Sequence, residues 1–135
     1  MSIGEYAFSA PVPLSISEAE EAVRRELAAE GFGVLTEIDV RTTLRQKLDL
    51  EFRPYRILGA CNPVLAHRAL AADPVVGVFL PCNVVLEEER AGSTRVLFME
   101  PRAVMRGSGL EVESVASEAS EKLHRVAGRL LAGAG

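Results

Sequence analysis

The sequence predicts an α+β protein with two layers, a mostly antiparallel sheet of four to five strands and helices packed on one of its faces. Two observations lead to this prediction. Stretches with apolar residues at every second position alternate with stretches in which they recur every third or fourth position, and these periods are typical of strands and helices. The last helical stretch is long and apolar along one side, so it has to cover a buried surface, most simply a sheet face.

Length and composition limit the classes of protein that fit. The chain has 135 residues, 48% of them hydrophobic, which suits a single domain over residues 1–135 with its own core. Its formal charge of −4 repels a phosphate backbone, so we expect no nucleic-acid partner. No apolar run reaches the roughly 20 residues of a membrane span, and the N-terminus lacks a signal-peptide pattern. We therefore expect a cytoplasmic protein with no membrane partner.

The first quarter of the chain predicts an edge strand followed by a helix. Residues 5–14 alternate weakly and contain two prolines, which cannot donate to a strand ladder and therefore suit an edge. Ser17 and Glu20 have the spacing of a capping box, which predicts a helix over residues 18–30. Gly31 follows where a left-handed residue usually ends a helix.

The next segments predict two further strands. Residues 32–42 alternate between apolar and charged side chains, which indicates a strand with one face in water. Residues 43–48 could add one or two turns of helix. Residues 55–60 indicate another short strand, bounded by a proline before it.

The Cys–Asn–Pro sequence that follows predicts the start of a second helix. Asparagine is a favoured N-cap and proline is favoured at the first helical position, so Asn62 and Pro63 begin a helix that continues over residues 64–73. Cys61 then lies just outside the cap, where an apolar side chain packs against the first turn.

The second half predicts an antiparallel pair of strands and a long helix. Residues 75–80 and 83–89 are either one strand broken by a Pro–Cys step or two strands that meet there, and the proline indicates a bulge or an edge. A turn at residues 90–93 leads to a returning strand over residues 94–100. Residues 110–131 have apolar side chains at steps of three and four, which predicts an amphipathic helix.

Three segments, GFGVLTEIDV at 31–40, YRILGACNP at 55–63 and LPCNVV at 80–85, closely resemble the family of domain of unknown function 302. Its members are small, mostly bacterial and archaeal proteins. The resemblance covers about residues 5–105, and the helix at 110–131 lies beyond it. It implies a two-layer α+β fold related to the TATA-binding-protein shape, often found as a dimer. It supplies no reaction, so no catalytic residue is carried over.

The two cysteines are the first candidates for a site. Cys61 precedes a helix N-terminus, whose dipole favours a thiolate, so it is the candidate nucleophile of a thiol-dependent enzyme or redox protein. It could also be a small buried hydrophobe. Cys82 lies at the suspected bulge, and bulges are common near functional sites. If the strand from residue 75 lies beside the strand from residue 55, the two Cys–Asn segments could be brought together at one end of the sheet.

A metal site would need further ligands. His67 lies one helical turn beyond Pro63 and could face Cys61. Together with Cys82 these residues would form a thiol and imidazole cluster for a soft metal. Because a closed four-ligand zinc site lacks its ligands, we expect no metal or other cofactor. His67 is otherwise a solvated or core histidine.

Residues 41–56 carry a net charge of +3 in an otherwise acidic chain. An anionic small molecule could dock there, or these charges could pair with the acidic strands.

No phosphate loop, nucleophile elbow or paired-carboxylate signature is present, so an enzymatic activity stays undecided. We expect a small-ligand-binding or interaction module that forms a homodimer, and the alternative is a thiol-dependent enzyme or a redox- or metal-responsive protein that uses Cys61 with Cys82 and His67. The candidate ligand-binding residues are Arg56, Gly59, Cys61, Asn62, His67, Cys82 and Asn83.

Overall fold

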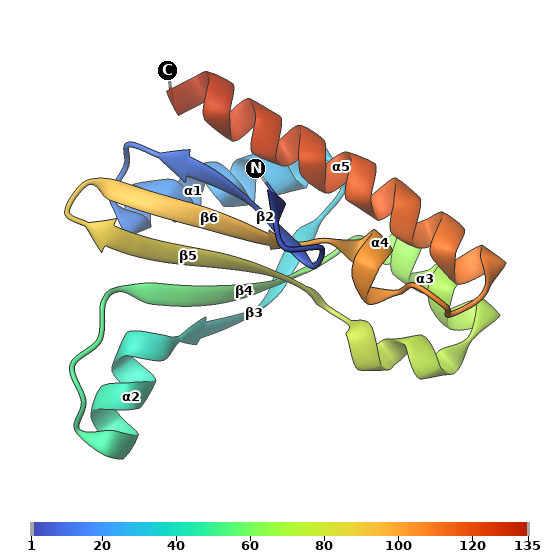
Figure 1. Ribbon diagram of the computed structural model, residues 1–135, viewed down its shortest axis with the longest axis horizontal. Helices are drawn as coiled ribbons and strands as arrows, with labels where there is room; N and C mark the ends of the chain where they lie inside the picture. Colours follow the sequence, from blue (N-terminus) through green and yellow to red (C-terminus); the bar gives the residue numbers. More distant parts are fainter. Residues whose placement is uncertain (1, 135) are drawn as a thin grey trace.

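The computed structural model describes residues 2–134, which form one six-stranded sheet with helices on one of its faces (Figure 1). The strands are β1 (Ser2–Ile3), β2 (Ala7–Val12), β3 (Gly33–Asp39), β4 (Tyr55–Cys61), β5 (Cys82–Arg90) and β6 (Ser93–Met99). The helices are α1 (Ile16–Ala29), α2 (Val40–Leu48), α3 (Pro63–Ala72), the 3-10 helix η1 (Pro74–Phe79), α4 (Pro101–Val104) and α5 (Leu110–Ala134). All neighbouring strands are antiparallel, in the order β1-β2-β6-β5-β4-β3. The predicted α+β class is confirmed, and the sixth strand is the short β1, which pairs with β2.

Two hydrophobic clusters hold the layers together. The larger lies between the sheet and the helices α1 and α5, and it contains the fully buried Leu27, Leu86 and Leu123. The smaller lies where α3 and η1 pack against the first half of α5, and it includes Leu65 and Val76. Burying one such side chain contributes about 1.5–3 kcal/mol. The apolar stripe of α5 therefore serves both clusters, because its first half covers α3 and its second half covers the sheet.

Helix α1 starts two residues earlier than the sequence pattern suggested. Ser15 is the N-cap: its hydroxyl accepts from the Glu18 amide at 3.2 Å, and the Glu18 carboxylate accepts from the Ser15 amide at 3.1 Å. The capping box predicted at Ser17 and Glu20 is therefore wrong, because both residues lie inside the helix, and the earlier start buries Ile16 in the core. Gly31 has a φ of 84° after the helix, as predicted.

The strand predicted over residues 32–42 ends at Asp39, because Asp39 caps α2. Its carboxylate accepts from the Thr42 amide at 2.9 Å. Helix α2 buries none of its residues and projects away from the sheet in Figure 1. Strand β3 is exposed on both faces apart from the half-buried Val34, so the expectation of a single wet face is wrong.

The strand predicted at residues 75–80 is wrong, because this segment forms η1. Asp73 caps it by accepting from the Val75 amide at 3.0 Å, and Pro74 occupies its first position, where proline is favoured. Pro81 therefore precedes β5 instead of interrupting it, and the register of β5 shifts between Glu88 and Arg90.

The remaining C-terminal predictions are confirmed. Strands β5 and β6 are joined by a tight turn in which Gly92 has a φ of 78°, and the apolar stripe predicted along α5 is buried. Within residues 2–134, none of the helices is both long enough and apolar enough to span a membrane.

Candidate functional site

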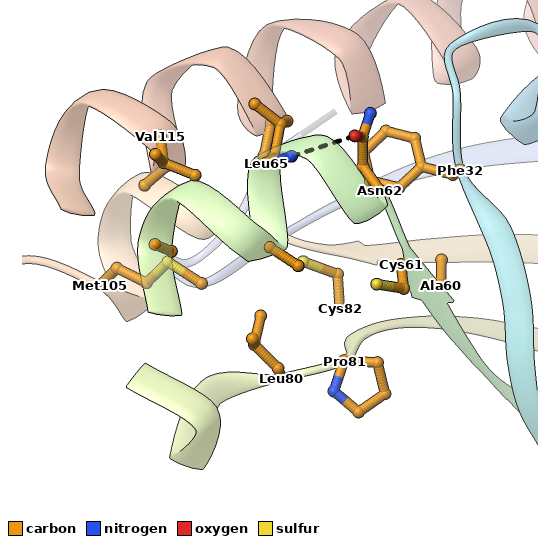
Figure 2. A pocket seen from close by; sticks show the side chains of 14 residues that line it. Phe32, Ala60, Cys61, Asn62, Leu65, Leu80, Pro81, Cys82, Met105 and Val115 are labelled. Carbon is orange, nitrogen blue, oxygen red and sulfur yellow. Dashed lines mark hydrogen bonds between the residues drawn. The ribbon is translucent and has the colours of Figure 1, made fainter. Parts of the chain in front are cut away.

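The two cysteines lie at the same end of the sheet and line one cavity. Cys61 is the last residue of β4 and Cys82 is the first of β5, and the antiparallel register places Ala60 directly opposite Cys82. Both thiols line one cavity, as Figure 2 shows. The strand that brings them together begins at residue 82 and not at residue 75.

The cavity lies between the ends of β4 and β5, helix α3 and the first half of α5. Its volume is about 30 Å³, which is room for a water-sized occupant. Apart from Asn62 and the sulfur-containing side chains, its walls are hydrocarbon. It is lined by Phe32, Ala60, Cys61, Asn62, Leu65, Ala66, Ala69, Leu80, Pro81, Cys82, Met105, Val115, Ala116 and Ala119.

Asn62 caps α3, as predicted, and also ties two helices together. Its side-chain oxygen accepts from the Leu65 amide at 3.2 Å, and its side-chain nitrogen donates to the Glu30 carbonyl oxygen at 3.2 Å. The asparagine therefore joins the end of α1 to the start of α3. Cys61 precedes the cap and Ala66 follows in the first turn; both line the cavity, which is the arrangement of a hydrophobic staple.

The two thiols have different environments. Cys82 is buried and Cys61 is half-buried. Burial, and secondly the neighbouring Cys61, raise the pKa of the Cys82 thiol to about 11. Among the described residues that line the cavity there is no imidazole or carboxylate, so a thiol-dependent enzyme would lack a neighbouring general base.

His67 and Asn83 do not belong to this cavity. His67 is exposed on α3 and is absent from the cavity wall. Asn83 points to the opposite face of the sheet, because successive strand residues alternate between faces. Residues 2–134 contain no cluster of three or more His, Cys, Asp or Glu side chains that could hold a metal, so the cluster of His67 with Cys61 and Cys82 does not form.

Gly59 is buried because two neighbours occupy the place of a side chain. A Cβ atom on Gly59 would lie 2.1 Å from the Thr36 hydroxyl oxygen and 2.7 Å from Cγ of Pro81. This glycine therefore allows Pro81 to pack against β4 beside the cavity, and it offers nothing to a ligand itself.

Arg56 lies toward the other end of β4 and is already paired. Its guanidinium donates to Glu20 at 2.8 Å. Burial of Glu20 opposes ionisation, but hydrogen bonds from Arg56 and Arg24 outweigh it and lower the pKa of that carboxyl. Arg56 also lines a groove of about 900 Å³ beside α2, which contains both basic and acidic side chains. The anion expected near residues 41–56 stays a prediction.

Sequence patterns did not identify the far wall of the cavity. Ala116 and Ala119 were assigned to no site because the last helix was expected to cover the sheet, and Met105 lies in a segment for which no element was predicted. A signal was present: Ala66 and Ala69 on α3, like Ala116 and Ala119 on α5, are small residues three apart, a spacing that places each pair on one side of its helix.

Comparison with known proteins gives a family and a solved structure. The family described as Domain of unknown function DUF302 matches residues 8–130. The crystal structure of an uncharacterised conserved DUF302 protein from Bacillus stearothermophilus is similar, with a TM-score of 0.85 and 29% sequence identity over 94% of this chain and 99% of that chain. No curated protein matches.

Proposed function

The chain belongs to the DUF302 family, a domain of unknown function, and from the geometry of its cavity we propose that it is a binding module for a very small ligand. The observation that carries this proposal is the apolar cavity between the strand ends and helices α3 and α5, which both cysteines line. Cavities with apolar walls and a few convergent polar groups are the usual form of a ligand site.

The size of the cavity limits the ligand. Sites for drug-sized molecules have volumes of about 300–1,000 Å³, whereas this cavity has about 30 Å³. The ligand is therefore an ion or a molecule of very few atoms. The half-buried Cys61 supports access from solvent, whereas Cys82 lies further inside.

Xenon tests the proposal because it is a small apolar atom that enters apolar cavities. Amide chemical shifts of the reduced, ¹⁵N-labelled protein would be recorded with and without xenon pressure. We expect shifts at Ala60, Asn62 and Cys82. An Ala66→Leu variant, which fills the cavity from α3, should lose them. The control Ala71→Leu places the same side chain on the exposed side of the same helix and should keep them.

The proposal fails if xenon causes no shift at these amides, or if the two leucine variants respond alike. Either result would mean that the space between α3, α5 and the strand ends is not open to a ligand.

The open face of the sheet supports the expected homodimer. The pairing of β4, β5 and β6 places Ile57, Val85 and Leu97 side by side on the face opposite the helices. Beside them Arg95 donates to Glu87 at 2.8 Å. A patch with apolar side chains and charges of both signs suits a two-fold interface, in which the same surface meets itself.

Two free thiols also fit a reducing compartment such as the cytoplasm.

Light scattering after gel filtration tests this assembly. We expect the wild type to have the mass of two chains and Val85→Lys to have the mass of one. Val75→Lys, which changes an exposed valine on η1, is the control and should leave the mass at two chains. A monomeric wild type contradicts the homodimer.

A further inference from the structure

The open face of the sheet, opposite the helices, has a groove that is much larger than the cavity between the layers. Its volume is about 380 Å³, within the range of about 300–1,000 Å³ that is typical of sites for drug-sized molecules. It crosses the sheet from β4 to β1, so a small organic molecule could lie along it. The groove is lined by Ile3, Tyr6, Ala7, Tyr55, Asn83, Val85, Arg95, Leu97, Phe98, Met99 and Val104.

Arg95 is the only charged side chain among the described residues that line this groove. Its Nε and Nη2 atoms donate to one oxygen of Glu87, at 3.2 and 2.8 Å. A guanidinium has five N–H groups, and within residues 2–134 those on Nη1 of Arg95 make no hydrogen bond. These free donors lie at the polar end of the groove, where the phenol of Tyr55 also contributes to the wall.

The charges around Arg95 nearly balance on the protein side. The second oxygen of Glu87 lies 3.4 Å from Nη1 of Arg53, and the exposed Glu89 attracts Arg95 as well. Two arginines therefore stand against two glutamates, and a ligand anion would gain little from a long-range field. It would instead gain from short, charge-assisted hydrogen bonds to the free N–H groups of Arg95, which a planar carboxylate can accept.

The rest of the groove follows from the β5–β6 register. Val85 lies opposite Leu97, two residues along β6 from Arg95, and these two side chains make an apolar floor. The next residues on the same face are Asn83 and Met99, because side chains alternate between faces. At about 3.4 Å per residue, Arg95 and Met99 are about 14 Å apart along the strand. The groove therefore suits a ligand with an acid group at one end and an apolar body.

We infer that this groove binds a small carboxylic acid with an apolar body, whose carboxylate accepts from Nη1 of Arg95 and whose body lies on Val85 and Leu97. The inference goes beyond the proposed function, because the groove is on the open face and the small cavity is on the helix side of the sheet. Val85 and Leu97 also belong to the patch of the expected homodimer, so the acid and a second copy compete for one face.

Binding of 4-phenylbutyrate and of its uncharged amide, 4-phenylbutanamide, tests the site. Amide chemical shifts of the ¹⁵N-labelled protein would be followed while each compound is added. We expect saturable shifts at Asn83, Val85 and Leu97. The dissociation constant should be about tenfold lower for the acid, because hydrogen bonds to a charged group are stronger than those to a neutral one.

The titrations would be repeated on Ile57→Gln, so that a second copy does not mask the groove. Ile57 belongs to the homodimer patch but does not line the groove. This variant should bind the acid at least as tightly as the wild type does, because no second copy competes.

Two arginine variants separate the role of Arg95 from the pairing of Glu87. Arg95→Gln should bind the acid and the amide with equal affinity, because it removes the charged donor. Arg53→Gln is the matched control, since Arg53 also pairs with Glu87 but is absent from the wall of the groove. It should keep the preference for the acid.

The inference is overturned if neither the wild type nor Ile57→Gln shows saturable shifts, if the acid and the amide bind equally to both, or if Arg53→Gln loses the preference as Arg95→Gln does. The comparison of acid and amide needs no arginine variant, so it decides the question even if Arg95→Gln fails to fold. The absence of xenon shifts would overturn the proposed function alone, because xenon reports on the small cavity.

Discussion

The side-chain amide of Asn62 makes two structural hydrogen bonds, one through its oxygen and one through its nitrogen. Its oxygen accepts from Leu65 at the start of α3, and its nitrogen donates to the Glu30 carbonyl at the end of α1. The capping role could be predicted because Asn followed by Pro has local backbone chemistry that needs no knowledge of the fold. The bond to Glu30 could not, because it joins residues 32 positions apart.

We predict that Asn62→Ala lowers the free energy of unfolding by about 1–2 kcal/mol, since it removes the cap and leaves the Glu30 carbonyl without this donor. Asn62→Asp keeps an acceptor for the cap and loses only the donor, so its loss should be smaller. Urea unfolding of the three proteins measures this order. Equal stability of wild type and Asn62→Ala would contradict the capping role.

Gly59 is required by its neighbours on the open face of the sheet. We predict that Gly59→Ala costs about 1–3 kcal/mol, because its Cβ would clash with Thr36 and Pro81. Gly33→Ala is the matched control: Gly33 is also in the sheet, but no atom lies within 4 Å of its Cβ position, so we expect a change within about 0.5 kcal/mol. Thermal unfolding compares the two, and similar melting temperatures would show that Pro81 can move away.

The directions of the His67 and Asn83 side chains depend on how α3 and β5 pack, so the sequence did not predict them. Of the two interpretations of His67, a residue facing Cys61 or a solvated or core histidine, the structure supports the solvated one, because Leu65 and Ala69 provide the buried side of α3. Asn83 was grouped with Cys82 by sequence adjacency, although adjacent strand residues point to opposite faces. The spacing of residues along a helix or strand predicts which of them share a face. Only the packing of the folded protein determines which of those faces lines the cavity.

At the scale of elements, α1 and α5 are joined by ion pairs as well as by their core contacts. Arg129 donates to Glu26 at 2.7 Å and to Glu30 at 2.9 Å, and Arg125 donates to Glu30 at 3.0 Å. The hydrogen bond from Arg129 lowers the pKa of Glu26, and the one from Arg125 lowers the pKa of Glu30. These helices are far apart in sequence, so no pattern predicted the pairs.

These pKa shifts predict acid sensitivity. Both folded pKa values lie below the unfolded value of about 4.3, so the stabilisation is complete above that value and is lost as the pH falls through the folded values. Urea midpoints at about pH 6 and about pH 3 should therefore differ less in Glu26→Gln/Glu30→Gln than in the wild type.

Glu21→Gln, on the exposed side of α1, is the control for removing a charge and should retain the wild-type difference. If the double variant loses as much stability in acid as the wild type, the α1–α5 pairs contribute nothing to it. The pairs are partly exposed, so the effect should also weaken in high salt.

At the scale of the whole molecule, the order of strands and helices predicted the α+β class and helices on one face. The periods of two and of three to four residues depend on local geometry, so they could be read from the chain. Two of the predicted segments have a different structure or different bounds. The apolar run at 75–80 is too short for periodicity to separate a strand from a helix, and the cap by Asp73 decided it. Helix α2 begins at Val40, before the helical turns predicted at residues 43–48, because Asp39 caps it.

The cavity itself belongs to this scale, since strand ends, α3 and α5 each contribute part of its wall. The sequence could place Cys61 and Cys82 near each other only on the condition that their strands were neighbours. The register between β4 and β5 meets that condition. The opposite wall depends on how α5 crosses α3, which the stripe of α5 alone did not reveal.

The central claim is that Cys61 stands at the solvent side of a small cavity and Cys82 inside it. Iodoacetamide labelling of the reduced native protein at pH 8, followed by peptide mass spectrometry, tests this most directly. The account predicts that Cys61 is alkylated in the native protein, whereas Cys82, whose burial raises its pKa to about 11, is alkylated only after denaturation or at much higher pH. Equal native reactivity of both cysteines, or protection of both until the protein is denatured, would contradict it.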